Sequence, residues 1–391
     1  MVRAVPTAPR ISLGTVVREW GRIGCLGFGG PAAHITLLRD LCVTRRGWID
    51  EREFEDTLAA VNLLPGPAST QLAIACAHRM RGRAGALVGG AGFILPGLAL
   101  VVLLSAAFLA RSPPVALLGA GAGAGAAVAA VAVKAGLDLI RPSWARATAR
   151  GRRAPMFTYI LLGAIAAATI GPYLVLVLLA CGGVSLLLGT RPLALPSLTP
   201  GPLAALAAAA ASAGGLGALC WTALKVGALS YGGGFVIIPL MQSDAVGQHH
   251  WMTDGQFLNA VALGQVAPGP VVLTVAVVGY AAAGVGGALL AALVAFSPSF
   301  LFVAIGADRF HALLADARAR AFVDGAAPAA LGAILGSAIP LALALGQTWQ
   351  WAVLAAAAVA LLVLRRGTVA TLVAAGAVGA VAALAGAPLS S

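Results

Sequence analysis

Charged side chains are scarce in this sequence. Only 10% of its 391 residues are Asp, Glu, Lys or Arg, whereas 60% are apolar. A water-soluble domain could not bury that much apolar surface in a single core. The shortage of charge therefore excludes a soluble globular fold and indicates an integral membrane protein.

Residues that several chemistries need are also missing. The five cysteines lie in no C-x-x-C pattern, so we expect no disulfide framework. His249 and His250 are adjacent, but no further His, Cys or carboxylate stands at the spacing of a metal site. A membrane-embedded enzyme would need a nucleophile or paired acids facing the bilayer interior, and none stands out. The sequence therefore predicts a protein that is not an enzyme and uses neither a metal ion nor a cofactor.

Long apolar stretches occupy most of the chain instead. They run roughly over residues 16–38, 57–77, 84–110, 115–133, 156–189, 202–241, 257–306, 321–346, 349–364 and 368–388. Because one membrane span takes about 20 residues, these stretches predict roughly ten to twelve transmembrane or re-entrant helices. They are continuous and rich in Ala, Leu and Gly, unlike the short alternating strands of a barrel. We therefore expect an all-α, multi-pass protein of the lipid bilayer.

An ungapped repeat divides the chain into two related halves, residues 1–200 and 201–391. Residues 28–67 return 203 positions later, so that Phe28-Gly29-Gly30 matches Tyr231-Gly232-Gly233 and Pro65-Gly66-Pro67 matches Pro268-Gly269-Pro270. Duplicated halves with Gly and Pro interruptions at matching positions are typical of secondary transporters, whose substrate binds where helices break near the midplane.

The two copies of the repeat differ in charge. The first copy contains Arg39, Arg45, Arg46 and Arg52, whereas the second, residues 231–270, contains no Lys or Arg. Arginine-rich loops favour the cytoplasmic side, so this difference predicts inverted repeats. Drift of loop charge between parallel halves is the alternative. The net charge of +12 is explained by such loops and does not indicate nucleic-acid binding.

Matching helix starts follow in both copies. Asp50 with Glu53, and Thr253 with Gln256, have the capping-box spacing, in which two side chains satisfy each other's backbone amides. The helix that begins there would run about 14 residues before Pro65 or Pro268, too short to cross the hydrocarbon core. Each segment therefore resembles either a discontinuous helix or a re-entrant hairpin.

The breaks have the chemistry of an anion site. A helix that begins after Pro67 would direct the free amides near Ala68, Ser69 and Thr70 into the break. A helix that begins at Pro31 would do the same with the amides near Ala32 and Ala33. Such helix ends bind anions. The alternative is that the glycines only let helices pack closely.

Two cations lie beside these motifs. Lys225 lies in a long uncharged run and matches Arg22 at the same offset of 203. An ionisable residue inside the membrane indicates function by default, although a long side chain can instead reach the interface. We therefore predict a substrate site, without catalytic residues, formed by Arg22, Gly29, Gly30, Pro31, Asn62, Pro65, Gly66, Pro67, Ser69, Thr70, Lys225, Gly232, Gly233, Gly234, Gln265, Pro268, Gly269, Pro270 and Thr274.

The motifs also resemble those of a known family. The run Phe28 to Ile35, the Pro-Gly-Pro of 65–67 before Gln71-Leu72-Ala73, and Tyr231-Gly232-Gly233-Gly234 are similar to the bacterial chromate ion transporter family. The likeness covers both halves and extends to residues 93–96 and 297–300. One departure is Val271-Val272-Leu273-Thr274, which is more apolar than the family pattern after the second break.

The resemblance implies a function. A two-domain, long-chain member of this family is expected to export chromate from the cytoplasm across the bacterial inner membrane by alternating access, and so to confer chromate resistance. Sulfate is a look-alike substrate, and the alternative function is a sulfate-type oxyanion permease with the same site. The sequence leaves open whether the protein is a homodimer.

Overall fold

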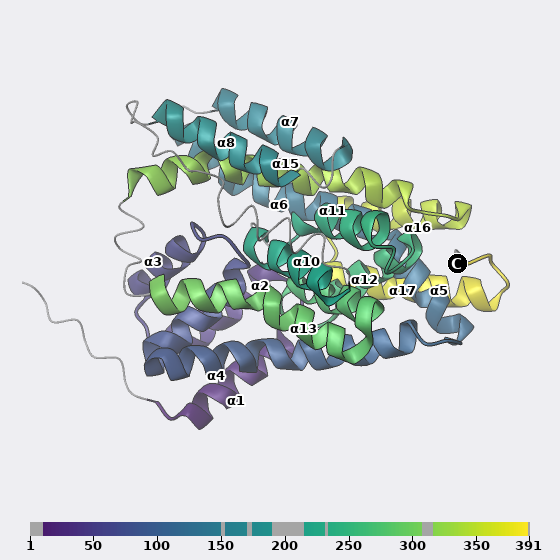
Figure 1. Cartoon of the computed structure of the whole chain (residues 1–391), viewed down its shortest axis with the longest axis horizontal. Helices are drawn as coiled ribbons and strands as arrows, with labels where there is room; N and C mark the ends of the chain where they lie inside the picture. Colours follow the sequence, from purple (N-terminus) through teal and green to yellow (C-terminus); the bar gives the residue numbers. More distant parts are fainter. Residues whose placement is uncertain are drawn as a thin grey trace, which may run out of the picture.

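The computed structural model describes residues 11–149, 153–169, 174–189, 215–230, 234–306 and 316–389. Within these ranges the chain forms helices and no strand, which confirms the all-α prediction (Figure 1). Four helical segments are long and apolar enough to cross a membrane: Ala68–Phe108, Val115–Ile140, Val271–Ala304 and Ala317–Leu343. Shorter apolar helices accompany them. The chain is therefore a multi-pass membrane protein.

The first half starts with a helical hairpin. Helix α1 (Leu13–Leu26) ends at Gly27, and helix α2 (Pro31–Arg39) begins after Gly29 and Gly30, whose φ angles of +102° and +76° suit glycine. The chain then returns beside α1 through the π-helical segment η1 (Asp40–Arg45), because Trp48 stacks on Trp20 with ring centroids 6.4 Å apart. We call residues 27–30 tip 1.

A second hairpin follows directly. The Asp50 side chain accepts a hydrogen bond from the Glu53 amide and caps helix α3 (Glu51–Val61), as the spacing predicts. After residues 62–67 the chain enters helix α4 (Ala68–Phe108), and we call residues 62–71, which include the first turn of α4, tip 2. Arg79 is ion-paired with Glu53, so the start of α3 lies beside a residue twelve positions past the break. The break is therefore a re-entrant hairpin rather than a discontinuous helix.

Helix α4 is itself folded back at Arg81 and Gly82, where the backbone leaves the helical region and Gly82 has φ +57°. A Cβ atom on Gly85 would lie 2.2 Å from the carbonyl oxygen of Ala77, so the two arms are in contact. The second arm, residues 83–108, is about 39 Å long at 1.5 Å per residue. That length is sufficient to span a bilayer.

The second half repeats this arrangement. It contains α10 (Leu216–Leu229), α11 (Ile237–Gln242), η4 (Ser243–Gln248), α12 (Asp254–Val266), the 3₁₀ turn η5 (Val271–Leu273) and α13 (Thr274–Gly306). Thr253 and Gln256 form the predicted capping box. Helix α13 folds back at Gly284, which has φ +61°. Tip 3 comprises Ser230 and Gly234, which flank residues outside the described ranges, and tip 4 comprises residues 267–270.

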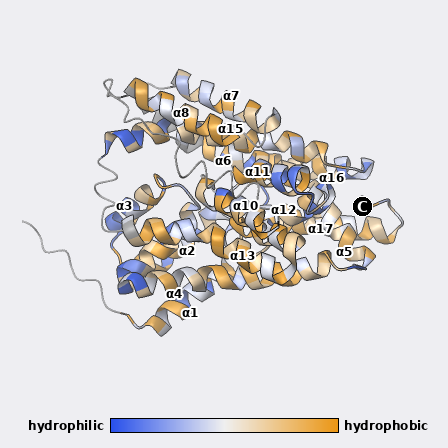
Figure 2. Ribbon diagram, viewed as in Figure 1, coloured by the Kyte–Doolittle hydropathy of each residue, from blue (hydrophilic) through white to orange (hydrophobic). Residues whose placement is uncertain are grey.

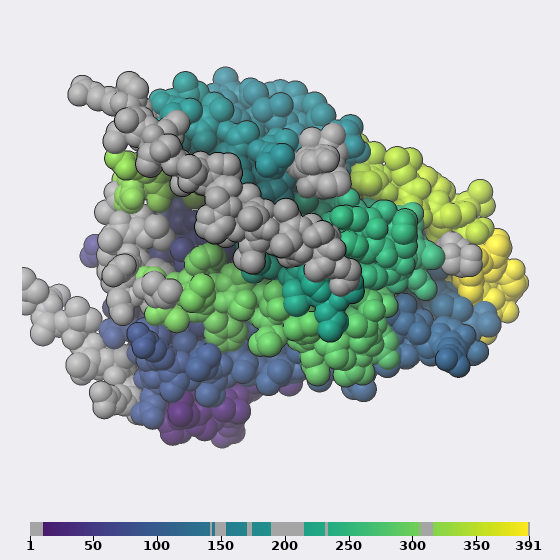
Figure 3. Space-filling view, in the orientation of Figure 1, coloured from purple at the N-terminus to yellow at the C-terminus, as the bar shows by residue number. Residues whose placement is uncertain are grey.

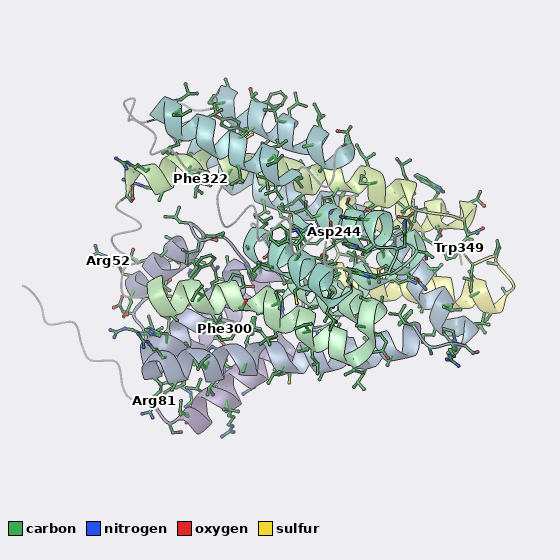
Figure 4. All side chains as sticks on the ribbon, viewed as in Figure 1. Arg52, Arg81, Asp244, Phe300, Phe322 and Trp349 are labelled. Carbon is green, nitrogen blue, oxygen red and sulfur yellow. The ribbon has the colours of Figure 1, made fainter. Side chains whose placement is uncertain are left out.

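The equivalent long arms run in opposite directions. In Figure 1 the second arm of α4 runs from the left end towards α5 at the right, whereas that of α13 runs from the right towards the left. Arg52 and Arg81 both lie at the left end of the molecule (Figure 4). Hydrophilic residues also gather at the left ends of α3, α4 and α15 (Figure 2). This arrangement fits the inverted repeats that the loop charges predict.

The remaining helices interlock the halves. They are α5 (Val115–Ala126), α6 (Val128–Ala149), α7 (Arg153–Thr169), α8 (Leu174–Gly189), α15 (Ala317–Leu343), α16 (Thr348–Ala358), η7 (Val359–Val363) and α17 (Thr368–Leu384). Small residues allow α5 to approach α17 at Gly123 and Gly379, and α7 to approach α15 at Gly163 and Ala329. Figure 3 shows green second-half helices between blue α4 and teal α7 and α8. The boundary predicted near residue 200 lies outside the described residues.

Candidate functional site

The tips of opposing hairpins meet inside the protein. At one contact, the Gly269 amide of tip 4 donates a 3.0 Å hydrogen bond to the Gly27 carbonyl of tip 1. At the other, a Cβ atom on Gly66 of tip 2 would lie 3.3 Å from the carbonyl oxygen of Gly227, just before tip 3. Residues 27 and 66 match residues 230 and 269 at the repeat offset. The second contact involves Gly227, three positions before residue 230, so the internal symmetry relates the two contacts only approximately, and together they bring the breaks into one central cluster.

Tip 2 is polar and partly open. Ser69, Thr70 and Gln71 are buried at the start of α4, whereas Asn62 and Pro65 of the same tip are exposed. The amides of Thr70 and Gln71 donate to the Pro67 carbonyl, so the first turn leaves the amides of Ala68 and Ser69 for a ligand. The prediction that the Thr70 amide is also free is wrong, because the tight first turn uses it.

Tip 4 is apolar and closed. Pro268, Gly269 and Pro270 are buried, and the following Val271, Val272 and Leu273 are at most 5% exposed. The Thr274 hydroxyl donates to the Val271 carbonyl at 2.8 Å, which satisfies it locally. The two Pro-Gly-Pro breaks therefore differ: tip 2 has the composition of a binding site, whereas tip 4 packs against the protein.

Histidine 34 connects tip 1 to tip 2. Its Nε2 lies 2.8 Å from the Gly27 carbonyl oxygen, and its Nδ1 lies 3.3 Å from the Ser69 hydroxyl. The ring also meets Phe93 edge-on, with centroids 5.0 Å apart. His34 is fully buried, and its two contacts connect the breaks of tip 1 and tip 2.

Several buried polar atoms near the tips have no hydrogen-bond partner. They are Thr70 Oγ1, Gln71 Oε1, Ser230 Oγ, Gln265 Nε2 and Ser299 Oγ. A buried polar group left unpaired costs about 1–3 kcal/mol, so such a concentration indicates a place for a ligand or water. Thr70 and Gln265 belong to the predicted site. Gln71, Ser230 and Ser299 do not, although each is a polar residue in an apolar stretch beside a Gly or Pro motif.

The two predicted cations, Lys225 and Arg22, do not lie as the sequence predicts. Lys225 Nζ lies 2.5 Å from Asp244 Oδ2, and Thr222 Oγ1 donates to the same oxygen at 2.8 Å. The Asp244 side chain is 4% exposed, so this carboxylate is buried and compensated. Arg22 is exposed on α1. The structure therefore does not place Lys225 as an uncompensated positive charge, and the sequence missed its partner because Asp244 lies 19 positions away.

The other predicted site residues divide by burial. Gly29 is exposed, Gly30 and Pro31 are half-buried, and Gly66, Pro67 and Gly234 are buried. A Cβ atom on Gly234 would lie 3.2 Å from that of Val271, so tip 3 packs against tip 4. Gly232 and Gly233 lie outside the described residues. Within the described ranges, no three His, Cys, Asp or Glu side chains are grouped as a metal site would require.

Comparison with known proteins identifies relatives over most of the chain. The sequence model of the chromate transporter family matches residues 14–186 and 217–381, one match in each half. A chromate transport protein of Cupriavidus metallidurans is 33% identical over 351 residues, covering 87% of this chain and 85% of the relative. A chromate transport protein of Pseudomonas aeruginosa is 31% identical over 360 residues, covering 87% and 83%. A probable chromate transport protein of Synechococcus elongatus is 30% identical over 341 residues, covering 85% of each. No solved structure matches the chain.

Proposed function

Because this chain belongs to the chromate transporter family, we propose that it exports chromate from the bacterial cytoplasm across the inner membrane and so confers chromate resistance. The observation that carries this proposal is the polar tip 2, where Thr70, Gln71 and Ser299 lack partners around a helix start. Two free amides, the helix dipole and neutral donors suit a tetrahedral anion. Relatives of this kind are named as transport proteins, not enzymes.

The charge of the substrate favours export. Moving one charge through 100 mV is worth about 2.3 kcal/mol, so a dianion leaving a negative-inside cell gains about 4.6 kcal/mol. Export can therefore run without a coupled cation. Uptake would need several co-transported cations, for which the apolar helices offer few carboxylates.

The opposed hairpins support a mechanism of alternating access. Tips 1 and 2 approach the centre from the end that carries Arg52 and Arg81, and tips 3 and 4 belong to the oppositely directed half. Rocking one pair of hairpins against the other would expose the central cluster to each side in turn. Gly29 and Gly30 of tip 1, with Pro31 at the start of α2, would border the anion opposite Asn62, Pro65, Gly66, Pro67 and Ser69.

The test is chromate flux in proteoliposomes with an imposed membrane potential. We expect chromate to leave the negative compartment, and a potential of opposite sign to reverse the net flux of an uncoupled ion. A chain that moves sulfate but not chromate would instead be the sulfate-type permease. A chain that moves neither would contradict the proposal.

A further inference from the structure

The amide of Gln71 has a fixed orientation. Its side chain is fully buried, and Nε2 donates a 2.6 Å hydrogen bond to the Pro65 carbonyl. A carbonyl only accepts, so the amide nitrogen must face it and the amide oxygen must point elsewhere. That oxygen, Oε1, has no hydrogen-bond donor. Tip 2 therefore contains one buried acceptor without a partner.

The amide group of Gln71 lies in a region that also contains unpartnered hydroxyl groups. A Cβ atom on Gly66 would lie 2.6 Å from Gln71 Nε2 and 3.3 Å from Ser299 Oγ, so the Gln71 amide and the Ser299 hydroxyl both lie against Gly66. The Thr70 hydroxyl, on the neighbouring residue, is also buried and unpartnered. The free amides of Ala68 and Ser69 add two more donors at this helix start.

A fully deprotonated tetrahedral anion offers only acceptors, and so it cannot satisfy Gln71 Oε1. An oxyanion that keeps one proton offers one O–H donor and three accepting oxygens. That set complements a region that contains one unpartnered acceptor together with hydroxyl and amide donors. We propose that the site binds its substrate in the singly protonated form, hydrogen chromate, and that Gln71 Oε1 accepts a hydrogen bond from the O–H group of that anion. This inference rests on the proposed function.

The proposal accounts for discrimination between chromate and sulfate, which share shape and charge. The last proton of chromate dissociates near neutral pH, so the protonated form is present in the cytoplasm, whereas sulfate has lost both protons. A site built to hydrogen-bond a hydroxyl rejects an analogue that lacks it, because its own polar group is left unpaired. Each chromium exported would then carry one charge instead of two.

Anion competition at one pH tests the proposal. The full chain is reconstituted in proteoliposomes, and exchange of dilute labelled chromate is measured at zero potential and neutral pH. Phosphate and arsenate keep an O–H there, whereas sulfate and selenate do not. We expect phosphate and arsenate to inhibit at concentrations at least about tenfold lower than sulfate and selenate. The apparent KM for total chromate should also rise about tenfold per pH unit in alkaline solution.

Variants assign the effect to the amide oxygen. Gln71→Met keeps the length of the side chain but removes the acceptor, and it should abolish the preference for protonated anions. Thr70→Val removes a neighbouring donor; it should weaken all four competitors together and leave their order unchanged. If Gln71→Met fails to fold, the anion competition and the pH dependence of the apparent KM in the unaltered chain still test the proposal.

The outcomes separate the two proposals. If chromate exchanges but sulfate competes as well as phosphate, the dianion binds and the inference is overturned while the transport function stands. Anion preference that persists in Gln71→Met overturns the role of Gln71. Absence of chromate exchange at every pH would contradict the proposed function itself.

Discussion

Lys225 has a different role in the structure from the one that the sequence suggests. In the sequence it is a lone cation in an apolar run, but in the structure its ammonium group contacts Asp244, and Thr222 supports the same carboxylate. Removing one partner of a buried ion pair leaves the other charge uncompensated, which costs far more than the pair itself is worth. The pair therefore connects α10 to η4, and the charge of Lys225 is already balanced by Asp244.

We predict that Lys225→Gln lowers the stability of the protein by about 3–5 kcal/mol, because Asp244 is left buried and unpaired. The double variant Lys225→Gln with Asp244→Asn should recover most of that loss. Thermal unfolding in detergent measures both. Arg22→Gln, at the matching position of the first half, is the control and should leave the unfolding temperature unchanged because Arg22 is exposed. Equal stability of the single and double variants would show that the two charges do not depend on each other.

Gly66 and Gly269 occupy matching positions but have different surroundings. Both have positive φ angles, +117° and +100°, so alanine strains either backbone. A Cβ atom on Gly66 would also lie 2.6 Å from Gln71 Nε2, whereas one on Gly269 meets nothing closer than 3.3 Å. We predict that Gly66→Ala raises the KM for chromate at least about tenfold, whereas Gly269→Ala mainly lowers stability. Flux against chromate concentration measures this, and equal KM values in the two variants would place the site outside tip 2.

At the scale of elements, local signals were enough to predict where helices begin and break. The Asp50 cap and the Thr253–Gln256 capping box form as their spacing indicates, and both Pro-Gly-Pro segments end a helix. The choice between a discontinuous helix and a hairpin depends on Glu53 and Arg79, which lie 26 positions apart. Such a contact depends on tertiary packing and has no local signal. The turn of α4 at Arg81 and Gly82 falls between the predicted apolar stretches 57–77 and 84–110, whereas the turn of α13 escaped prediction because a single glycine, Gly284, provides it inside a continuous apolar run.

The hairpin of α3 and α4 can be tested by cross-linking. In a cysteine-free background, Glu53→Cys and Arg79→Cys should be joined by a short bifunctional thiol reagent, because the native side chains are in contact. A discontinuous helix would separate the two positions by about 40 Å, at 1.5 Å for each of 26 residues. The measurement is the shift in peptide mass after proteolysis between the two sites. Glu53→Cys with Arg111→Cys is the control, since α4 carries residue 111 away from α3, and a cross-link there would contradict the hairpin.

At the scale of the whole molecule, the repeat predicts symmetry, but it does not predict that the two copies differ in polarity and packing. Residues 69–71 of tip 2 are Ser, Thr and Gln, whereas their counterparts after tip 4 are Val272, Leu273 and Thr274. The sequence showed this departure, but only the burial of tip 4 and the Gly269–Gly27 hydrogen bond show its consequence. The first copy has buried polar groups without partners at tip 2, whereas tip 4 of the second copy is apolar and packs against tip 1.

The inverted arrangement predicts opposite exposure of two matching loops. Gly47 and His250 are both exposed, each in the loop that separates the two hairpins of its half. The Arg-rich loop around Gly47 should face the cytoplasm, because arginine is retained on that side, and its uncharged counterpart should face outward. Single cysteines at positions 47 and 250, in a background without native cysteines, are labelled in intact cells and in inverted vesicles with an impermeant maleimide. We expect position 250 to react in cells and position 47 only in inverted vesicles. Labelling of both positions from one face would mean that the halves are parallel, and the antiparallel arms of α4 and α13 would then need another explanation.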